Sequence, residues 1–189
     1  MELFGDDMIE EVKDETSGLL QKALVTLLEN ERSEDNLIDS EKLQKDLETL
    51  YQILEKDESE AELLKILSVR SSLEIKYLAN EYKVVYGQSL AKSISERFGG
   101  GDGAKVLVSI VEYNEDVLDY FISKIKKACD GMGTNDDSLI RVIVSRNEVD
   151  LREICSAFKS KYSTSLKEVI SEECSGDYKK ILLGLIEKE

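Results

Sequence analysis

The stretch "GMGTNDDSLIRVIVSR", residues 131–146, joins a glycine turn to the start of an amphipathic helix. Gly131 and Gly133 let the backbone adopt turns that a Cβ atom disfavours, so that carbonyl oxygens can converge on one point. Thr134 stands where the N-cap of the following helix is expected, and with Asp137 it has a loose form of the capping box. Converging carbonyl oxygens, joined by one carboxylate from elsewhere in the chain, are ligands that calcium takes.

Three other interpretations of this turn can be compared with a calcium loop, and the sequence excludes two of them. A phosphate-binding P-loop is excluded, because no Lys-Ser/Thr pair follows the second glycine. An EF-hand is excluded, because the alternating Asp/Asn ligands of its twelve-residue loop are missing. For the motif taken alone, a plain connection between two helices is the simpler interpretation, and it stays open beside a calcium loop.

The rest of the chain has a helical pattern. It contains no proline and its 11 glycines are clustered, so long stretches carry no helix breaker. Apolar residues recur there at three- and four-residue steps, and Ser165 with Glu168 has the spacing of a capping box. The fold class is therefore predicted to be all-α, with about ten short helices. The periodic apolar residues include Leu43, Leu47, Leu50, Leu54, Ile122, Ile125, Ile154 and Phe158.

Composition excludes several classes of protein. Among 189 residues, 40 Asp and Glu against 25 Lys and Arg give a net charge of −15, which argues against a nucleic-acid-binding surface. No apolar run approaches the ~18 residues of a membrane span, and the acidic N-terminus is not a signal peptide. Three cysteines without a CxxC motif indicate reduced thiols and a cytoplasmic protein.

Histidine is absent, which narrows the chemistry further. Its absence removes the commonest general base and the commonest transition-metal ligand, so serine triads, His-based zinc sites and His-ligated haem are excluded. No nucleophile–base pair can be proposed, and the chain is not expected to be an enzyme. Abundant carboxylates without histidine favour a hard cation bound through oxygen, if a metal is bound at all.

The sequence also repeats internally. Residues 70–94 align with residues 146–170 at an offset of 76, with identical residues at six positions and similar residues at four. A third partial copy near the N-terminus pairs Glu15 with Glu173. Shared polar and glycine positions in a fixed order favour true repeats over chance similarity between amphipathic helices. The identical pairs are Arg70/Arg146, Lys83/Lys159, Tyr86/Tyr162, Ser89/Ser165, Leu90/Leu166 and Ile94/Ile170.

The turn, the stretch "SGDYKKILLGLI" at residues 175–186 and the acidic Glu173, 39 positions after Thr134, together resemble a repeat of the annexin family. The resemblance implies an all-α bundle of short helices in five-helix repeats, truncated at the N-terminus relative to the family's four repeats. It divides the chain into the last helices of a partial second repeat (1–29), an acidic linker (30–40), a degenerate third repeat (41–112) and a fourth repeat with a calcium loop (113–189).

The resemblance implies a main calcium site in the fourth repeat. The loop ligands would be the backbone carbonyls of Cys129, Gly131 and Gly133, and the Glu173 carboxylate would close the site. Calcium is then the one expected cofactor.

Two further sets of residues are implied by the same resemblance. The Thr134 carbonyl and the Asp136 carboxylate would form a weaker accessory site. Glu15 matches the closing carboxylate of the second repeat, but the chain contains no glycine loop to partner it, so Glu15 is expected to be an orphan ligand.

The third repeat departs from the family pattern. At an offset of 76, Glu55 and Asp57 stand in place of the two glycines, Glu58 in place of the threonine and Arg97 in place of the carboxylate. We expect no calcium site there, because the Arg97 guanidinium would repel the ion, and we expect the loop to be a solvated acidic surface.

Two arginines and two cysteines could also be taken for functional residues, but we expect them to be structural. Arg70 and Arg146 should hold helix-end carbonyls or an acidic partner rather than contact lipid. Cys129 and Cys174, on either side of the expected site, should be inert thiols.

Two functions follow as hypotheses. The first is calcium-dependent binding to anionic phospholipid membranes, with the protein cytoplasmic and peripheral at membranes when calcium rises. The alternative is an acidic helical scaffold that works through protein contacts with little calcium dependence. In either case, self-association or association with the missing N-terminal half is expected, with Leu19, Leu20, Leu27 and Leu28 as candidate contacts.

Overall fold

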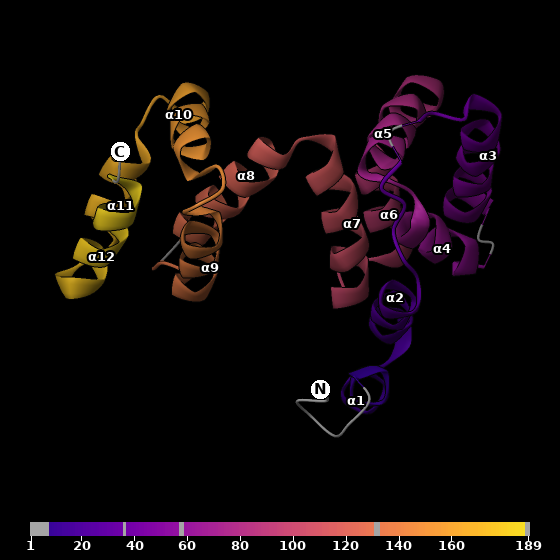
Figure 1. Ribbon diagram of the computed structural model, residues 1–189, viewed down its shortest axis with the longest axis horizontal. Coiled ribbons are helices and arrows are strands. Elements are labelled where there is room, and N and C mark those ends of the chain that lie inside the picture. The colour runs from indigo at the N-terminus through magenta and orange to yellow at the C-terminus, as the bar shows by residue number, and fades with distance from the viewer. Residues whose placement is uncertain (1–7, 36, 57–58, 131–132, 188–189) are drawn as a thin grey trace. The chain divides into compact units, whose positions relative to one another are not determined.

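The computed structural model describes residues 8–35, 37–56, 59–130 and 133–187. These residues form twelve α-helices and no β-strand (Figure 1). The predicted all-α fold is confirmed, with slightly more helices than expected. The helices belong to two compact units, residues 1–115 and 116–189, each with a core of its own.

The two units contain the same series of five helices, which the internal repeat explains. The segments that align at an offset of 76 begin where α4 and α9 end, and they continue into α6 and α11. The first unit contains α1 (Met8–Glu15), α2 (Gly18–Glu29), α3 (Ser40–Lys56), α4 (Ala61–Val69), α5 (Ser72–Tyr86), α6 (Leu90–Phe98) and α7 (Asp102–Glu115). The second contains α8 (Val117–Cys129), α9 (Asp136–Arg146), α10 (Leu151–Tyr162), α11 (Leu166–Glu173) and α12 (Gly176–Ile186).

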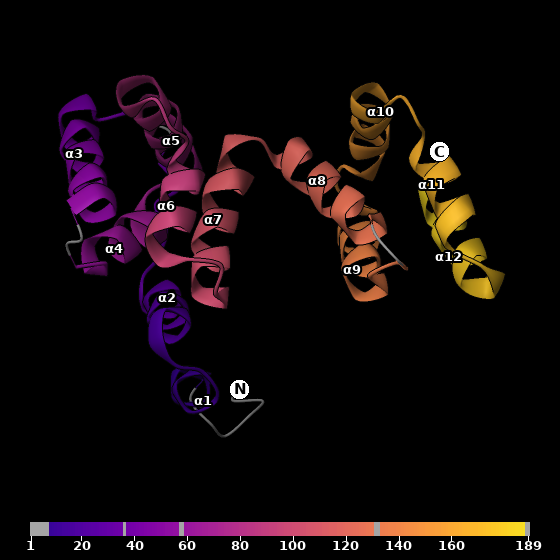
Figure 2. The ribbon, with the colours of Figure 1, turned by 180° about the vertical axis from the view of Figure 1, so that it is seen from behind.

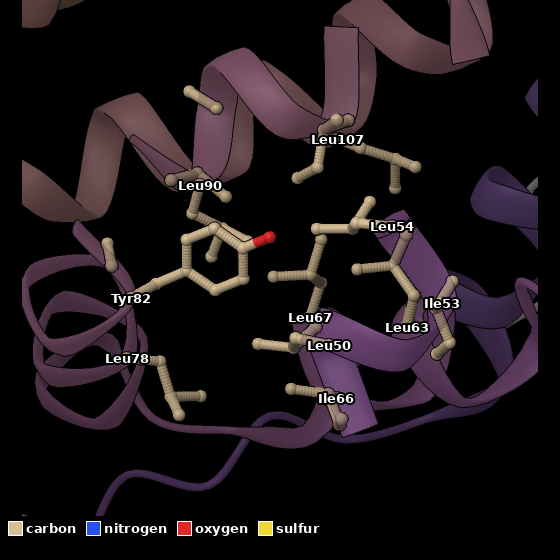
Figure 3. Packing of buried hydrophobic residues seen from close by; sticks show 14 of the residues in the cluster. Leu50, Ile53, Leu54, Leu63, Ile66, Leu67, Leu78, Tyr82, Leu90 and Leu107 are labelled. Carbon is tan, nitrogen blue, oxygen red and sulfur yellow. The ribbon is translucent and has the colours of Figure 1, made fainter. Parts of the chain in front are cut away.

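Leucines from five helices fill the core of the first unit (Figure 3). Leu50, Leu63, Leu78, Leu90 and Leu107 come from α3 to α7 in that order, and none is more than 1% exposed. Such close packing of aliphatic side chains is the main source of the stability of this unit. The second core is built in the same way, from residues that include Ile125, Leu139, Ile154, Phe158, Leu166 and Ile170.

Tyr82 is fully buried in the first core, and its hydroxyl points in among the leucine side chains (Figure 3). The hydroxyl has no hydrogen-bond partner in the described part of the chain, and burial raises the pKa of Tyr82. Phe158 has the equivalent position in the second unit and is buried to the same extent. An aromatic ring thus fills this position in both cores, and in the first it carries a buried hydroxyl whose desolvation opposes folding.

The paired arginines have internal partners, as expected. Two nitrogens of Arg70 donate to Asp46 on α3, at 2.5 and 2.9 Å. Arg146 donates twice to Asp150, at 2.7 Å each, and its guanidinium lies 4.6 Å from the centroid of the Phe121 ring. Both ion pairs are largely shielded from water, and each fixes the end of a helix.

The connection from α2 to α3 is only partly the solvated linker that its charge suggests. Its acidic residues are exposed, but Arg32 is half-buried and donates to the carbonyls of Leu67 and Arg70 at 2.7 and 2.6 Å. The Ser33 amide donates to the Val69 carbonyl at 2.9 Å. The connection thus caps the C-terminal end of α4, where helix carbonyls otherwise have no partner.

Helix α2 packs against α7 at very short range, within the first unit (Figure 2). Gly103, in the first turn of α7, makes this approach possible. A Cβ atom on Gly103 would lie 2.6 Å from the Leu20 nitrogen and 2.8 Å from the Leu19 carbonyl carbon, both backbone atoms. Neither atom can move without shifting α2, so only glycine fits here.

We expect Gly103→Ala to lower the free energy of unfolding by about 2–3 kcal/mol, measured by chemical denaturation, because its methyl group would force α2 away from α7. Gly100→Ala is the matched control. A Cβ atom at Gly100 meets open space and its φ is not positive, so its effect should stay within about 0.5 kcal/mol. Equal effects of the two variants would contradict the close approach.

Candidate calcium site

The loop between α8 and α9 is closed by backbone geometry. The Asn135 amide donates to the Ala128 carbonyl at 2.8 Å, which brings the two ends of the loop together. Gly133 has a φ of +95°, a conformation that other residues rarely adopt, as the glycine pattern predicted. The other loop glycine, Gly131, lies outside the described residues.

Helix α9 begins one residue later than the sequence suggested. The N-cap is Asn135, whose side-chain oxygen accepts from the Ser138 amide at 3.0 Å. The prediction that Thr134 caps this helix is therefore wrong. Asparagine caps a helix at least as well as threonine, so Asn135 itself was the signal that sequence reasoning missed. The predicted capping box of Ser165 and Glu168 is confirmed.

Because Thr134 does not cap the helix, its side chain is available for another contact. Its hydroxyl donates to the Glu173 carboxylate at 3.4 Å, a long hydrogen bond between residues 39 apart in sequence. Glu173 is the last residue of α11 and is exposed, so the end of this helix brings a carboxylate to the loop. The structure thus brings together the two residues whose spacing drew attention in the sequence.

Cys129, the last residue of α8, contributes a carbonyl at the C-terminal end of that helix, where partial negative charge accumulates. Its side chain is buried, and burial raises the pKa of the thiol to about 11, with smaller contributions from Cys174 and Glu173. The thiol is therefore protonated at neutral pH and is a poor metal ligand. This is consistent with a role for the backbone oxygen of Cys129 alone.

Asp136, the expected accessory ligand, lies near the same helix ends. Burial raises the pKa of Cys174, and the carboxylates of Asp136 and Glu173 raise it further. Burial, followed by the nearby Asp136 carboxylate, also raises the pKa of Tyr178 on α12. Two carboxylates from different helices therefore act on one buried thiol beside the loop.

The described residues contain no group of three His, Cys, Asp or Glu side chains that could hold a metal. An ion at this loop would therefore depend on backbone carbonyls, with Glu173 as the main charged ligand. Such all-oxygen donors, neutral carbonyls with a carboxylate, fit a hard cation such as calcium and do not fit a soft transition metal. The ligand set that the sequence resemblance implied, with Glu173 as its carboxylate, therefore stays a proposal.

Glu15 has no comparable surroundings. It is the exposed last residue of α1 and lines an open hollow with Asp14, Ser17 and Asp102. Gly101 and Gly103, before and in the first turn of α7, also line this hollow. The interpretation of Glu15 as an orphan ligand stays a proposal.

Comparison with known proteins identifies the fold. The annexin family model matches residues 120–185. Mouse annexin A13 is 36% identical over 186 residues, which cover 97% of this chain and 58% of that protein. The chain belongs to the annexin family.

Solved annexin structures agree with this assignment. Chicken annexin V in complex with Zn²⁺ superimposes with a TM-score of 0.88 at 32% identity, over all of this chain and 60% of that one. Calcium-bound annexin (Sm)1 gives a TM-score of 0.81 at 26% identity, over 99% of this chain and 55% of that one. The present annexin therefore spans little more than half the length of these relatives.

We expect Glu173→Gln to lower calcium affinity by about tenfold or more in isothermal titration calorimetry, because glutamine keeps the shape of the side chain and loses its charge and bidentate carboxylate. Glu172→Gln is the matched control, since it removes the same charge from the neighbouring exposed position of α11. If the two variants bind calcium with equal affinity, Glu173 is not a ligand.

Proposed function

We propose that this annexin binds calcium at the loop between α8 and α9 and that the bound ion attaches the protein to anionic phospholipid membranes. Annexins in general bind phospholipid in a calcium-dependent manner, and family membership supports the same activity here. The observation that carries the proposal for this chain is the contact between Thr134 and Glu173, which brings a carboxylate to a loop of carbonyl donors.

The electrostatics require an ion between protein and membrane. With a net charge of −15, the chain is repelled by an anionic lipid surface. The proposed ligands on the protein leave calcium coordination positions open, and an oxygen of a lipid phosphate can occupy one of them. The ion then binds both anionic partners at once, so that membrane attachment follows the calcium concentration.

Attachment of this kind is peripheral and involves no reaction. None of the helices in the described ranges is long and apolar enough to cross a membrane. We propose a non-enzymatic protein that is cytoplasmic at low calcium and moves to membranes when calcium rises. We also propose that residues 1–29, 41–112 and 113–189 belong to successive annexin repeats, because α3–α7 and α8–α12 follow the same order.

The alternative function is an acidic scaffold that acts through protein contacts. It is favoured by the first unit, where Arg97 at the end of α6 stands in place of the expected carboxylate. The sequence then contains a single complete set of proposed calcium ligands. A protein with one calcium loop gains no avidity from several loops on one surface. Calcium dependence of membrane binding distinguishes the two functions.

We expect the protein to sediment with vesicles of phosphatidylcholine and phosphatidylserine in calcium and to be released by chelator. Vesicles of phosphatidylcholine alone are the lipid control, and Glu173→Gln should abolish the calcium effect. Added salt should release less protein than chelator does, because a coordinated ion is less screened than separated charges. Equal binding in calcium and in chelator would favour the scaffold instead.

We further propose that the chain associates with itself or with the first half of an annexin core. Of the four candidate leucines on α2, Leu19 packs against the core of the first unit, whereas Leu28 is 43% exposed. Ile181 on α12 is also exposed, at 63%. Exposed aliphatic side chains on helices favour association, because burial removes their surface from water.

Sedimentation equilibrium at high protein concentration should therefore show a dimer or larger species. We expect Leu28→Glu to weaken this association, whereas Leu37→Glu, a change at an exposed leucine between α2 and α3, should not. A monodisperse monomer of the unaltered protein would rule out self-association.

A further inference from the structure

In the first unit the C-terminal part of α3 contacts Arg97 of α6, and the second unit has a glutamate in place of this arginine. The internal repeat places Arg97 where Glu173 stands and Ile53 where Cys129 stands. Arg97 is at the end of α6 and Ile53 is near the end of α3, as their counterparts are on α11 and α8. The Nε of Arg97 donates to the Ile53 carbonyl at 3.3 Å. Arg97 thus reaches the carbonyl that corresponds to the proposed calcium-ligating carbonyl of Cys129.

The surroundings of this carbonyl favour a cation. The Ile53 side chain is 2% exposed, so its backbone is held in the core while its oxygen faces Arg97. The carbonyls at the C-terminal end of α3 carry partial negative charge, which a guanidinium offsets. The guanidinium also lies 5.0 Å from the centroid of the Phe98 ring, a distance that favours a cation–π contact.

An acidic residue at the start of α4, Glu60, also interacts with positive charge. Glu60, the counterpart of Asp136, accepts from the Lys22 ammonium on α2 at 2.6 Å. The pKa of Glu60 is lowered chiefly by this hydrogen bond, and the Arg97 charge also contributes. Arg97 therefore acts on both a carbonyl and a carboxylate that correspond to proposed calcium ligands in the second unit.

We infer that the Arg97 guanidinium takes the place at the C-terminal end of α3 that calcium takes in the α8–α9 loop, and so holds this end of α3 to α6 without metal. The correspondence rests on the proposed calcium site of the second unit. A guanidinium is always charged and is tethered by its own side chain, so its contacts are independent of the calcium concentration. The α8–α9 loop of this annexin then responds to calcium, whereas the C-terminal end of α3 does not, with Arg97 as the positioning residue of that helix end.

Hydrogen–deuterium exchange of the peptide that contains the C-terminal end of α3 tests this inference. The experiment uses the Glu173→Gln background, in calcium and in chelator, so that the α8–α9 site contributes nothing. With Arg97 intact, the peptide should exchange at the same rate in both conditions. Arg97→Gln should exchange about fivefold faster in both, because the cation is lost and nothing replaces it. Lys92→Gln, which removes an exposed positive charge from the same helix, is the control and should leave the rate unchanged.

Arg97→Glu provides the readout that a merely structural role would not change. It restores a carboxylate at the position of Glu173 and should exchange quickly in chelator and slowly in calcium, as calcium replaces the guanidinium. Unchanged exchange in Arg97→Gln, or rapid exchange of Arg97→Glu in calcium as well as in chelator, would overturn the inference. Calorimetry of Glu173→Gln alone tests the α8–α9 site, so failure of the proposed function and failure of this inference are distinguishable.

Discussion

The proposed calcium site depends on the packing that brings the end of α11 to the loop between α8 and α9. Glu173 ends α11 and Cys129 ends α8, and the carboxylate contributes to the loop only because α12 packs against α9, α10 and α11. The hydrogen bond from Thr134 shows that the carboxylate reaches the loop. The ligand set is therefore a consequence of tertiary packing between helices, and no continuous stretch of sequence contains it.

This packing produces the same electrostatic problem in both units. Each brings a helix C-terminus, with its partial negative charge, toward acidic side chains. In the first unit the problem is solved by the protein itself, through Arg97 at the Ile53 carbonyl and Lys22 at Glu60. In the second, a carboxylate replaces the arginine and increases the negative charge, which makes an external cation favourable. The first unit thus has an arginine at the position where the second has Glu173, and the proposed calcium site is in the second unit.

Features encoded by local periodicity could be predicted from the sequence. Apolar spacing identified the all-helical fold, and every periodic apolar residue named from it is buried. The Ser165–Glu168 capping box was apparent because its hydrogen bonds join residues three apart. The positions of Gly133 and Glu173 were also predictable, since the resemblance placed them relative to one another. Such features depend on neighbours in the chain or on a repeated spacing, both of which a sequence displays.

Other features depend on contacts between distant segments and were not predicted. The contact of Thr134 with Glu173 joins α11 to the loop before α9, and Asn135 rather than Thr134 caps α9. Arg32 caps α4 because the connection between α2 and α3 passes the end of that helix. The acidic composition of the connection did not indicate this contact. The role of Gly103 appears only once α2 is placed against α7. In each case the residue type allowed several roles, and the tertiary structure selected one.

The paired arginines show how repeats can diverge at one position and retain a common function. Arg70 and Arg146 stand at equivalent positions of the repeat. The counterpart of Asp46 in the second unit is Ile122, which cannot accept a hydrogen bond from the Arg146 side chain. In the second unit Arg146 donates instead to Asp150, four residues further along the chain, and the Phe121 ring contacts the guanidinium. A half-buried arginine needs some anionic partner, although no particular helix has to provide it. Charge balance is therefore required in both units although different residues provide it, and the inferred role of Arg97 in place of a calcium ion follows the same rule.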